Sequence, residues 1–339
     1  MMNKQNKSYF TAGLLFGLVI SLLIFTITVR NGQGPQKSQT VVLKLAHALD
    51  QSHPVHLGMV EMGEKLKELS GGRIELQIFP NGQLGSETEC IEQLQRGALA
   101  MTKVSAAIME SFLPEMSVFS LPYIFRDEAH FWNVLEGPIG QKVLEMPASV
   151  GLRGLCYYDS GSRNFYTINK PILSPSDLIG QKIRVMKNKT SMDMIETMGG
   201  SPTPIPWGEL YTALQQHMVD GAENNVPSFY TNRHFEVCKY FAFDEHSRIP
   251  DMLFISEKVW NELTPEERGW VQEAAKASSD YQRKLWADMT ADALVKIQEE
   301  GVGVYYPEKQ SFVDKVQPLL DSFKGASIGD LVEQIRETN

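Results

Sequence analysis

Basic charge is in short supply in this chain. Its 339 residues include 32 lysines and arginines against 41 aspartates and glutamates, which gives a formal net charge of −9. A protein that binds nucleic acid needs a surplus of positive charge to neutralise the phosphates. The composition therefore argues against a nucleic-acid partner.

Cysteine is also scarce. The three cysteines, Cys90, Cys156 and Cys238, lie far apart and form no Cys-x-x-Cys pair. A sparse and odd number is not the pattern of a disulfide framework, and isolated cysteines usually behave as small apolar side chains. We expect three buried cysteines.

Motifs of catalysis and of cofactor binding are missing from the sequence. There is no Ser-His-Asp arrangement, no phosphate-binding loop and no dinucleotide glycine fingerprint. His53 and His56 have the spacing of a metal-binding pair, but no third ligand lies near them. We therefore expect no metal, no cofactor and no enzymatic activity.

The N-terminus carries a long apolar run. Lys4 and Lys7 precede residues 9–29, which contain no charge, and Arg30 follows. About 20 apolar residues can cross a bilayer, whereas a secretory signal has a shorter apolar core. Lysines before the run favour a cytoplasmic N-terminus. We expect residues 1–38 to be an export signal with a linker, either cleaved or retained as a membrane anchor, and the body to be periplasmic or otherwise extracytoplasmic.

The first part of the body predicts alternating strands and helices. Apolar residues indicate a strand at 41–48, a helical stripe begins at Pro54, and residues 73–79 alternate strictly. Ser86 and Glu89 then have the spacing of a capping box, and residues 98–104 form the next strand. This order is typical of an open α/β sheet, which binds ligands beyond the carboxyl ends of its strands.

A second α/β lobe is predicted from about residue 160. It is followed by a helix start at Thr264-Pro265, with Glu267 as the third helical residue. No glycine or proline interrupts residues 270–300, so this helix reaches roughly 50 Å at about 1.5 Å per residue. A helix of that length is longer than one small lobe, and we expect it to run across both.

Residues 161–225 hold the side chains that favour a receptor over a catalyst. Arg184 lies in an apolar strand, where a guanidinium needs either a structural ion pair or a ligand carboxylate, and Arg163 poses the same question. Trp207 either packs in the core or lies flat against a sugar-like ligand. Asn224 belongs either to an ordinary turn or to a ligand-binding amide group. The sequence alone leaves these alternatives open.

Several long motifs occur in one order along the chain. They are Phe79-Pro80-Asn81-Gly82-Gln83-Leu84-Gly85, Leu121-Pro122-Tyr123-Ile124-Phe125-Arg126-Asp127, Lys182-Ile183-Arg184-Val185, Pro202-Thr203-Pro204, Glu209-Leu210-Tyr211-Thr212-Ala213-Leu214-Gln215 and Asp220-Gly221-Ala222-Glu223-Asn224. With these motifs the chain from Leu43 to the C-terminus resembles the solute receptors of tripartite ATP-independent periplasmic (TRAP) transporters, a family named for its C4-dicarboxylate-binding member.

The resemblance implies roles for four residues of the second lobe. Arg184 pairs with the carboxylate of the substrate, and Arg163 assists it. Asn224 hydrogen-bonds the same end of the ligand. Trp207 stands where the family carries an aromatic side chain that covers the ligand.

Four further positions follow from the resemblance. His47, Glu87 and Ser105 of the first lobe align near positions that touch the variable end of the ligand, and Lys187 lies in the comparable region of the second lobe, where a strand ends. The segments 161–166, 223–228 and 245–247 are similar to the sugar-acid branch, whose members take hexuronates such as glucuronate or galacturonate.

The implied fold is two-lobed, like that of periplasmic binding proteins, with a long helix that spans both lobes. Residues 39–160 with about 250–289 form lobe I, and residues 161–249 with about 290–339 form lobe II. The implied function is to bind a small organic acid by hinge closure and to deliver it to membrane permease subunits.

Three alternatives follow from the same residues. The pocket serves equally well in a membrane-tethered sensing module of a signalling system. A receptor for a C4-dicarboxylate or a keto-acid is the second alternative. A hydrolase or isomerase of sugar acids is the third, but it needs a base with a nucleophile or a metal, and the sequence offers no such set.

Overall fold

The computed structural model describes residues 13–23, 40–324 and 328–338, and the chain divides into two units, residues 1–41 and 42–339. In the first unit residues 13–23 are helical. None of the helices in these described ranges has the length and apolar character needed to cross a membrane. Residues 9–12 and 24–29 of the predicted apolar run, and the linker up to residue 38, lie outside the described residues.

The second unit contains two sheets. The first has the strand order β2-β1-β3-β10-β4. Strand β1 runs parallel to β3, whereas β10 is antiparallel to both β3 and β4. Because of this pairing, Asp251 at the start of β10 lies opposite Ser105 at the end of β3. The bounds are β1 Val41–Ala46, β2 Ile74–Phe79, β3 Met101–Ser105, β4 Leu152–Tyr158 and β10 Asp251–Ser256.

The second sheet has the order β11-β9-β5-β8-β6-β7. Strand β5 is antiparallel to β8 and β9, while β6 is parallel to β7 and β8. The carboxyl ends of β6 and β8 therefore meet at one edge. The bounds are β5 Arg163–Thr167, β6 Lys182–Val185, β7 Ser201–Pro204, β8 Gly221–Asn224, β9 Tyr240–Ser247 and β11 Gly303–Tyr305.

Strand β8 differs from the simplest interpretation of its sequence. A turn is the ordinary expectation for a Gly-Ala-Glu-Asn segment, yet these residues form a fully buried strand. Gly221 permits close packing there, because a Cβ atom at this position would lie 2.4 Å from the carbonyl oxygen of Tyr166. The polar side chains of β8 are consequently placed inside the molecule.

The helices begin and end where local chemistry predicts. Helix α2 starts at Pro54 after His53, whose ring accepts a hydrogen bond from the backbone N–H of Val55. Helix α3 has the predicted capping box of Ser86 and Glu89. The bounds are α2 Pro54–Leu69, α3 Glu87–Arg96, α4 Ala106–Met109, α5 Glu128–Glu136, α6 Pro138–Glu145, α7 Lys189–Met198, α8 Leu210–Gln215, α9 Val226–Thr231 and α10 Glu257–Glu262, with 3-10 segments at Pro114–Ser120, Met146–Val150, Pro175–Leu178, Trp207–Glu209 and His234–Glu236.

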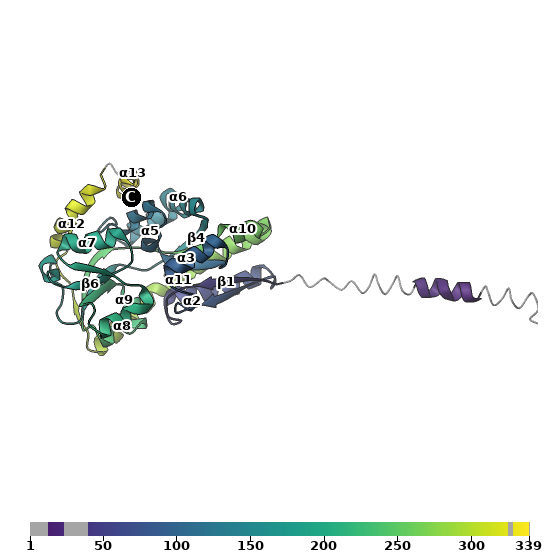
Figure 1. The fold of residues 1–339 in the computed structure, drawn as a ribbon, viewed down its shortest axis with the longest axis horizontal. Coiled ribbons are helices and arrows are strands. Elements are labelled where there is room, and N and C mark those ends of the chain that lie inside the picture. Colours follow the sequence, from purple (N-terminus) through teal and green to yellow (C-terminus); the bar gives the residue numbers. More distant parts are fainter. Residues whose placement is uncertain (1–12, 24–39, 325–327, 339) are drawn as a thin grey trace, which may run out of the picture. The chain divides into compact units, whose positions relative to one another are not determined.

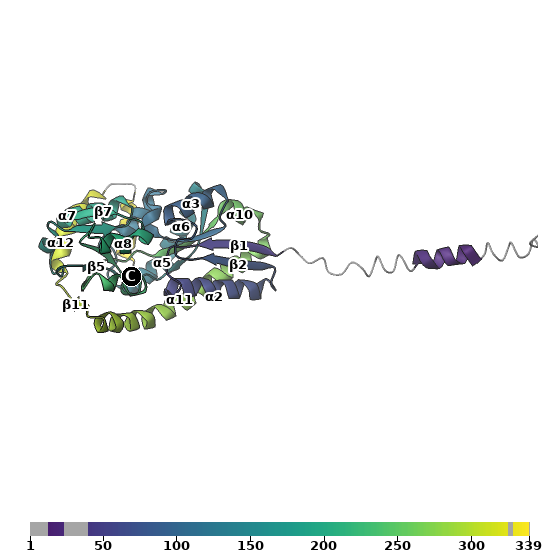
Figure 2. The same ribbon diagram turned by 60° about the horizontal axis from the view of Figure 1, so that its bottom comes forward.

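Helix α11, Pro265–Glu299, is continuous over 35 residues and starts with the predicted capping box of Thr264 and Glu267. It packs against α2 and β4 beside the first sheet and against α9 beside the second. Figure 2 shows it along one side of the body, close to α2 at one end and to β11 at the other. The expected mixed α/β fold with a long helix spanning both lobes is confirmed.

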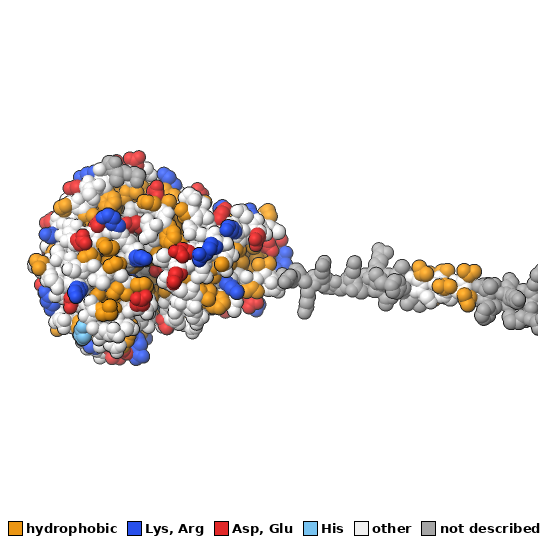
Figure 3. All heavy atoms as spheres, viewed as in Figure 1, with side chains coloured by type: hydrophobic (Ala, Val, Ile, Leu, Met, Phe, Trp, Pro, Cys, Tyr) orange, Lys and Arg blue, Asp and Glu red, His pale blue; other side chains and the backbone are white. Residues whose placement is uncertain are grey.

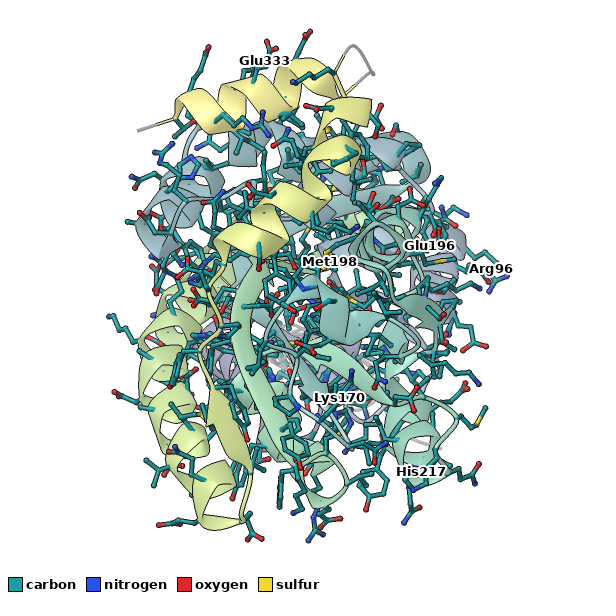
Figure 4. The ribbon with its side chains drawn as sticks, turned by 90° about the vertical axis from the view of Figure 1, so that its left-hand side faces the viewer. Arg96, Lys170, Glu196, Met198, His217 and Glu333 are labelled. Atoms are coloured by element: carbon teal, nitrogen blue, oxygen red, sulfur yellow. The ribbon has the colours of Figure 1, made fainter. Side chains whose placement is uncertain are left out.

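The C-terminal helices divide between the two halves of the body. Helix α12, Gln310–Ser322, packs on α7 and β9, whereas α13, Gly329–Glu337, packs on α6. Arg126, just before α5, also donates hydrogen bonds to the backbone carbonyls of Arg336 and Thr338. The sequence predicts residues 290–339 in lobe II, and within this range α13 contacts α6. Figure 4 shows both helices across one end of the body, with Glu333 pointing outward.

Apolar side chains fill the body in three clusters. One lies between the first sheet, α2 and α11, one lies against the second sheet, and the third combines residues of both sheets with the 3-10 segment Pro114–Ser120 and α12. Cys90, Cys156 and Cys238 are buried and free, as expected. Figure 1 shows the helices α7, α8 and α9 around the second sheet. Acidic and basic side chains are interspersed on the face drawn in Figure 3.

Candidate functional site

A cavity is lined by residues from both sheets and from the segments that connect them, and its open space, with the solvent at its mouth included, is about 450 Å³. Ser160 lies in the connection from β4 to β5, and Ile249 in the connection from β9 to β10. The lining residues are Ala48, Leu49, Glu87, Lys103, Ser105, Ser160, Arg163, Arg184, Met186, Trp207, Asn224, Asn225, Ser228, Ile249 and Asp251.

A wider hollow of about 1450 Å³ adjoins this cavity and shares Ala48, Glu87, Arg184 and Trp207 with it. Exposed Lys187 lines this outer hollow and does not line the inner cavity.

Arg184 brings an incompletely paired charge into the cavity. Its Nε donates to the carbonyl oxygen of Ile205 at 2.8 Å, but its buried Nη1 has no hydrogen-bond partner within the described residues. Burial lowers the pKa of this guanidinium, which nevertheless stays charged because arginine holds its proton in proteins. A buried, unpaired donor of this kind is costly, and an anion in the cavity would pair with it.

Trp207 holds a second donor in the same state. Its ring lies 5.6 Å from the Arg184 guanidinium and 5.1 Å from the His234 ring. Its Nε1 is buried, and no group in the described part of the chain accepts a hydrogen bond from it. Burial, followed by the charge of Arg184, lowers the pKa of His234 to about 3, so this neighbour is neutral.

Arg163 is committed to the protein. It forms an ion pair through Nε with the Glu223 carboxylate, and its Nη2 donates to Glu223 Oε1 at 2.8 Å. The same Nη2 donates to the Glu223 carbonyl at 2.8 Å, and Nη1 donates to Asn224 Oδ1 at 2.9 Å. Because Oδ1 of Asn224 is occupied in this way, its amide NH₂ group is the part left for a ligand.

Behind Arg163 lies a buried row of charges. His246 places Nε2 3.4 Å from Glu223 and Nδ1 2.8 Å from Asp244. Burial alone would lower the pKa of His246, but Asp244 and Glu223 outweigh it and raise the pKa to about 9. Burial alone would likewise raise the pKa of Glu223, but Arg163 and His246 lower it to about 2. The row therefore holds Arg163 in place with alternating charges.

On the opposite wall, Lys103 is buried between two carboxylates. Its Nζ lies 3.1 Å from Asp251 Oδ1 and 3.4 Å from Glu87 Oε1. Glu87 Oε1 also accepts a hydrogen bond from the backbone N–H of Ser105 at 3.1 Å. Burial opposes the charge on Lys103, but the two carboxylates prevail and raise its pKa.

The structure places His47 behind the cavity wall. It is buried, with Nε2 2.9 Å from His56 Nδ1, and its own Nδ1 accepts from the backbone N–H of Leu49 at 3.1 Å. Burial, followed by the charge of Lys103, lowers its pKa to about 2, so the ring is neutral. His47 therefore supports the segment of Ala48 and Leu49, which does line the cavity, rather than lining it itself.

Of the eight predicted site residues, the cavity brings together Arg184, Arg163, Asn224, Trp207, Glu87 and Ser105, and it leaves out His47 and Lys187. Sequence reasoning missed Lys103 and Asp251. The signal for Lys103 was present, because a charge within the apolar run 101–105 poses the same problem as Arg184. Asp251 gave no comparable signal, since it stands at the edge of its apolar segment.

The chain matches the family model described as bacterial extracellular solute-binding protein, family 7, over residues 45–326. Among curated proteins it is 40% identical to the protein YiiZ of Salmonella typhimurium over 285 residues, which cover 84% of this chain and 87% of the relative.

Two solved structures are close in sequence and in shape. A TRAP periplasmic solute-binding protein of Bradyrhizobium, in complex with galacturonate, is 41% identical with a TM-score of 0.85, over 87% of this chain and 99% of its own. A TRAP periplasmic solute-binding protein of Pseudomonas putida F1, with bound D-glucuronate, is 36% identical with a TM-score of 0.85, over 88% of this chain and 97% of its own.

Proposed function

Because this chain belongs to the bacterial extracellular solute-binding proteins of family 7, we propose that it is the receptor of a TRAP transporter for a hexuronate such as galacturonate or glucuronate. It binds the acid outside the cytoplasm and carries out no reaction on it. The acid is held in the inner cavity, with its carboxylate on the wall formed by the second sheet.

The observation that carries this proposal is the buried, unpartnered Nη1 of Arg184. Buried polar groups in folded proteins are nearly always hydrogen-bonded, so each exception needs a reason. A carboxylate at this place would accept from Arg184 Nη1 and from the free amide group of Asn224. Charge-assisted hydrogen bonds of this type contribute roughly 1.5–3 kcal/mol each.

The other polar groups of the cavity suit a hydroxylated ligand. Ser228 Oγ lies 3.1 Å from Nε2 of His53. The Nδ1 atom of the same His53 ring already accepts a hydrogen bond from the backbone N–H of Val55. His53 is therefore the donor in this contact, and the Ser228 hydroxyl keeps its own proton for a ligand oxygen. Trp207 offers both an aromatic face and its free Nε1. Arg163 acts through Asn224 as a positioning residue, with one Nη1 proton left for the ligand.

Binding is coupled to closure of the two lobes in this proposal. Lobe I comprises residues 39–160 with about 250–289, and lobe II comprises residues 161–249 with about 290 to the end of α12, whereas α13 goes with lobe I. Contacts such as His53–Ser228 at 3.1 Å and Asn188 Nδ2–Glu110 Oε2 at 2.8 Å join the lobes beside the cavity. The closed receptor then docks on membrane permease subunits, and residues 9–29 act as an export signal or a tether.

A thermal-shift screen tests the function. Purified protein is melted with uronates, aldonates, keto-acids and C4-dicarboxylates, because a ligand at 100 times its dissociation constant stabilises a protein by about 2.7 kcal/mol. We expect galacturonate or glucuronate to give the largest rise in melting temperature. A rise with dicarboxylates alone, or with none of these acids, would rule out the proposed ligand class.

A further inference from the structure

The wall of the cavity formed by the first sheet carries a cluster of three ionisable side chains, Glu87, Lys103 and Asp251. Lys103 is 3% exposed, and the carboxylates are 14% and 10% exposed. The cluster is held by three different elements, since Glu87 begins α3, Lys103 lies within β3 and Asp251 begins β10. The proposed function gives none of these three side chains a role in distinguishing one acid from another.

The two carboxylates keep half of their acceptor atoms for the cavity. Oε1 of Glu87 and Oδ1 of Asp251 are the atoms that face Lys103. Within the described part of the chain, Oε2 of Glu87 and Oδ2 of Asp251 accept no hydrogen bond from the protein, and both side chains line the cavity. A neutral hydroxyl can donate to such an oxygen, whereas another carboxylate cannot.

The charges of the cavity are arranged with opposite signs on its two walls. Lys103 with two carboxylates leaves one negative charge on the first wall. On the second wall Glu223 neutralises Arg163, so the charge of Arg184 is left over. Counted over the described residues, the ionisable side chains that line this cavity are Glu87, Lys103, Arg163, Arg184 and Asp251. The cavity therefore matches a ligand with one anionic end and one neutral, hydroxylated end.

We propose that Glu87 and Asp251 are specificity-determining residues that exclude acids with a second carboxylate. The inference rests on the proposed function, because it takes the first carboxylate of the ligand to lie on Arg184. The second end of the ligand then lies against the two carboxylates. A hydroxyl group at that end donates a hydrogen bond to them, whereas a carboxylate there is repelled. The site thus takes monoanionic sugar acids and rejects aldarates, which differ from them by oxidation of that end.

The test compares two open-chain acids of the same length and configuration, L-galactonate and galactarate. They differ only where a CH₂OH group of the first is a carboxylate in the second, so shape and ring form are matched. Affinities are measured by calorimetry at pH 7.5, after a titration with galacturonate. We expect galactarate to bind on the order of 100-fold more weakly than L-galactonate, since like charges brought together cost several kcal/mol.

Two single variants assign this difference to the cluster. Glu87→Gln and Asp251→Asn each remove one charge and leave Lys103 one carboxylate partner. If one of the two variants does not fold, the other still carries the test. We expect either variant to lower the ratio of the galactarate dissociation constant to the L-galactonate dissociation constant by about tenfold. Glu64→Gln, an exposed change on α2 with the same effect on net charge, should leave the ratio unchanged within about twofold.

The outcomes separate this inference from the function on which it rests. Binding of galacturonate together with equal affinity for galactarate and L-galactonate overturns the inference alone. The inference is also overturned if neither cluster variant changes the ratio of the two dissociation constants. Tighter binding of galactarate than of L-galactonate overturns it as well, because the second carboxylate would then pair with Lys103. Failure of galacturonate, of glucuronate and of both open-chain acids to bind the wild-type protein overturns the proposed function and the inference with it.

Discussion

In the cavity the Cζ atom of Arg184 lies 5.6 Å from the centre of the Trp207 ring, and each of the two side chains has a buried N–H group with no acceptor in the described part of the chain. Polar groups in a well-packed interior normally find partners during folding, because leaving them unpaired costs roughly 1–3 kcal/mol. Two such donors side by side mark a place where the ligand-free protein is less stable than its packing allows. We interpret them as donors held ready for an oxyanion.

The first prediction concerns the stability of the ligand-free protein. Replacing Arg184 by methionine removes an unpaired buried charge but also leaves the Ile205 carbonyl without its donor. These effects oppose each other, so the free energy of unfolding should stay within about 1 kcal/mol of the wild type. Urea denaturation of both proteins measures it. A loss of more than about 2 kcal/mol would mean that Arg184 is primarily structural.

Arg163 should behave in the opposite way, although it lines the same cavity. Arg163→Met leaves Glu223 buried without its main cation, and we expect a loss of about 3–5 kcal/mol in the free energy of unfolding. The double variant Arg163→Met with Glu223→Gln should recover part of that loss, because no unpaired carboxylate remains. Equal losses for Arg163→Met and Arg184→Met in urea denaturation would refute this division of roles.

A third prediction follows from His246. Its pKa is raised from 6.5 to about 9 in the folded protein, so protonation stabilises the fold fully below pH 6.5 and the stabilisation is lost as the pH rises through 9. The shift corresponds to roughly 3 kcal/mol. Urea denaturation of the wild type between pH 6.5 and 9.5 should therefore show a falling free energy of unfolding.

The variant His246→Gln should flatten that slope, because it removes the titrating group. His217→Asn provides the control, since His217 is exposed and lies at the edge of the body in Figure 4. It should keep the wild-type slope. A slope that survives in His246→Gln would place the titrating group elsewhere.

The acid limb of the same profile belongs to Glu223. Its pKa is lowered from 4.5 to about 2, so its contribution is present above pH 4.5 and is lost as the pH falls through 2. Removing the carboxylate in Glu223→Gln should lower the stability at neutral pH and reduce the loss of stability between pH 4.5 and 2. An unchanged acid limb would show that Glu223 does not carry it.

Much of the fold was predictable because local chemistry and periodicity agree. The Thr264–Glu267 capping box and the absence of glycine and proline from residues 270–300 indicated both the start and the length of α11. Strand β8 was harder, since its buried Glu223 and Asn224 both pair with the side chain of Arg163 in the neighbouring strand β5. A contact across 60 residues has no local signal in the chain.

The site was predictable in large part but not in full, for a similar reason. An arginine in an apolar strand raises the question of what pairs with its charge, and the sequence raised it equally for Arg184 and Arg163. In the structure Arg163 is paired with Glu223, whereas Nη1 of Arg184 has no partner within the described residues. His47 was predicted to face the ligand and instead pairs with His56. Position along the chain sets which residues come near a cavity, whereas the direction of each side chain depends on packing that only the structure provides.

The most direct test of the account is calorimetric titration of galacturonate into the wild type, Arg184→Ala and Arg153→Ala. Arg153 is a half-exposed arginine of β4 that pairs with Glu257 outside the cavity, so it controls for the loss of an arginine. We predict saturable binding to the wild type and to Arg153→Ala, and affinity at least about 100-fold weaker for Arg184→Ala. Undiminished affinity in a folded Arg184→Ala protein would contradict the central claim that this guanidinium holds the carboxylate.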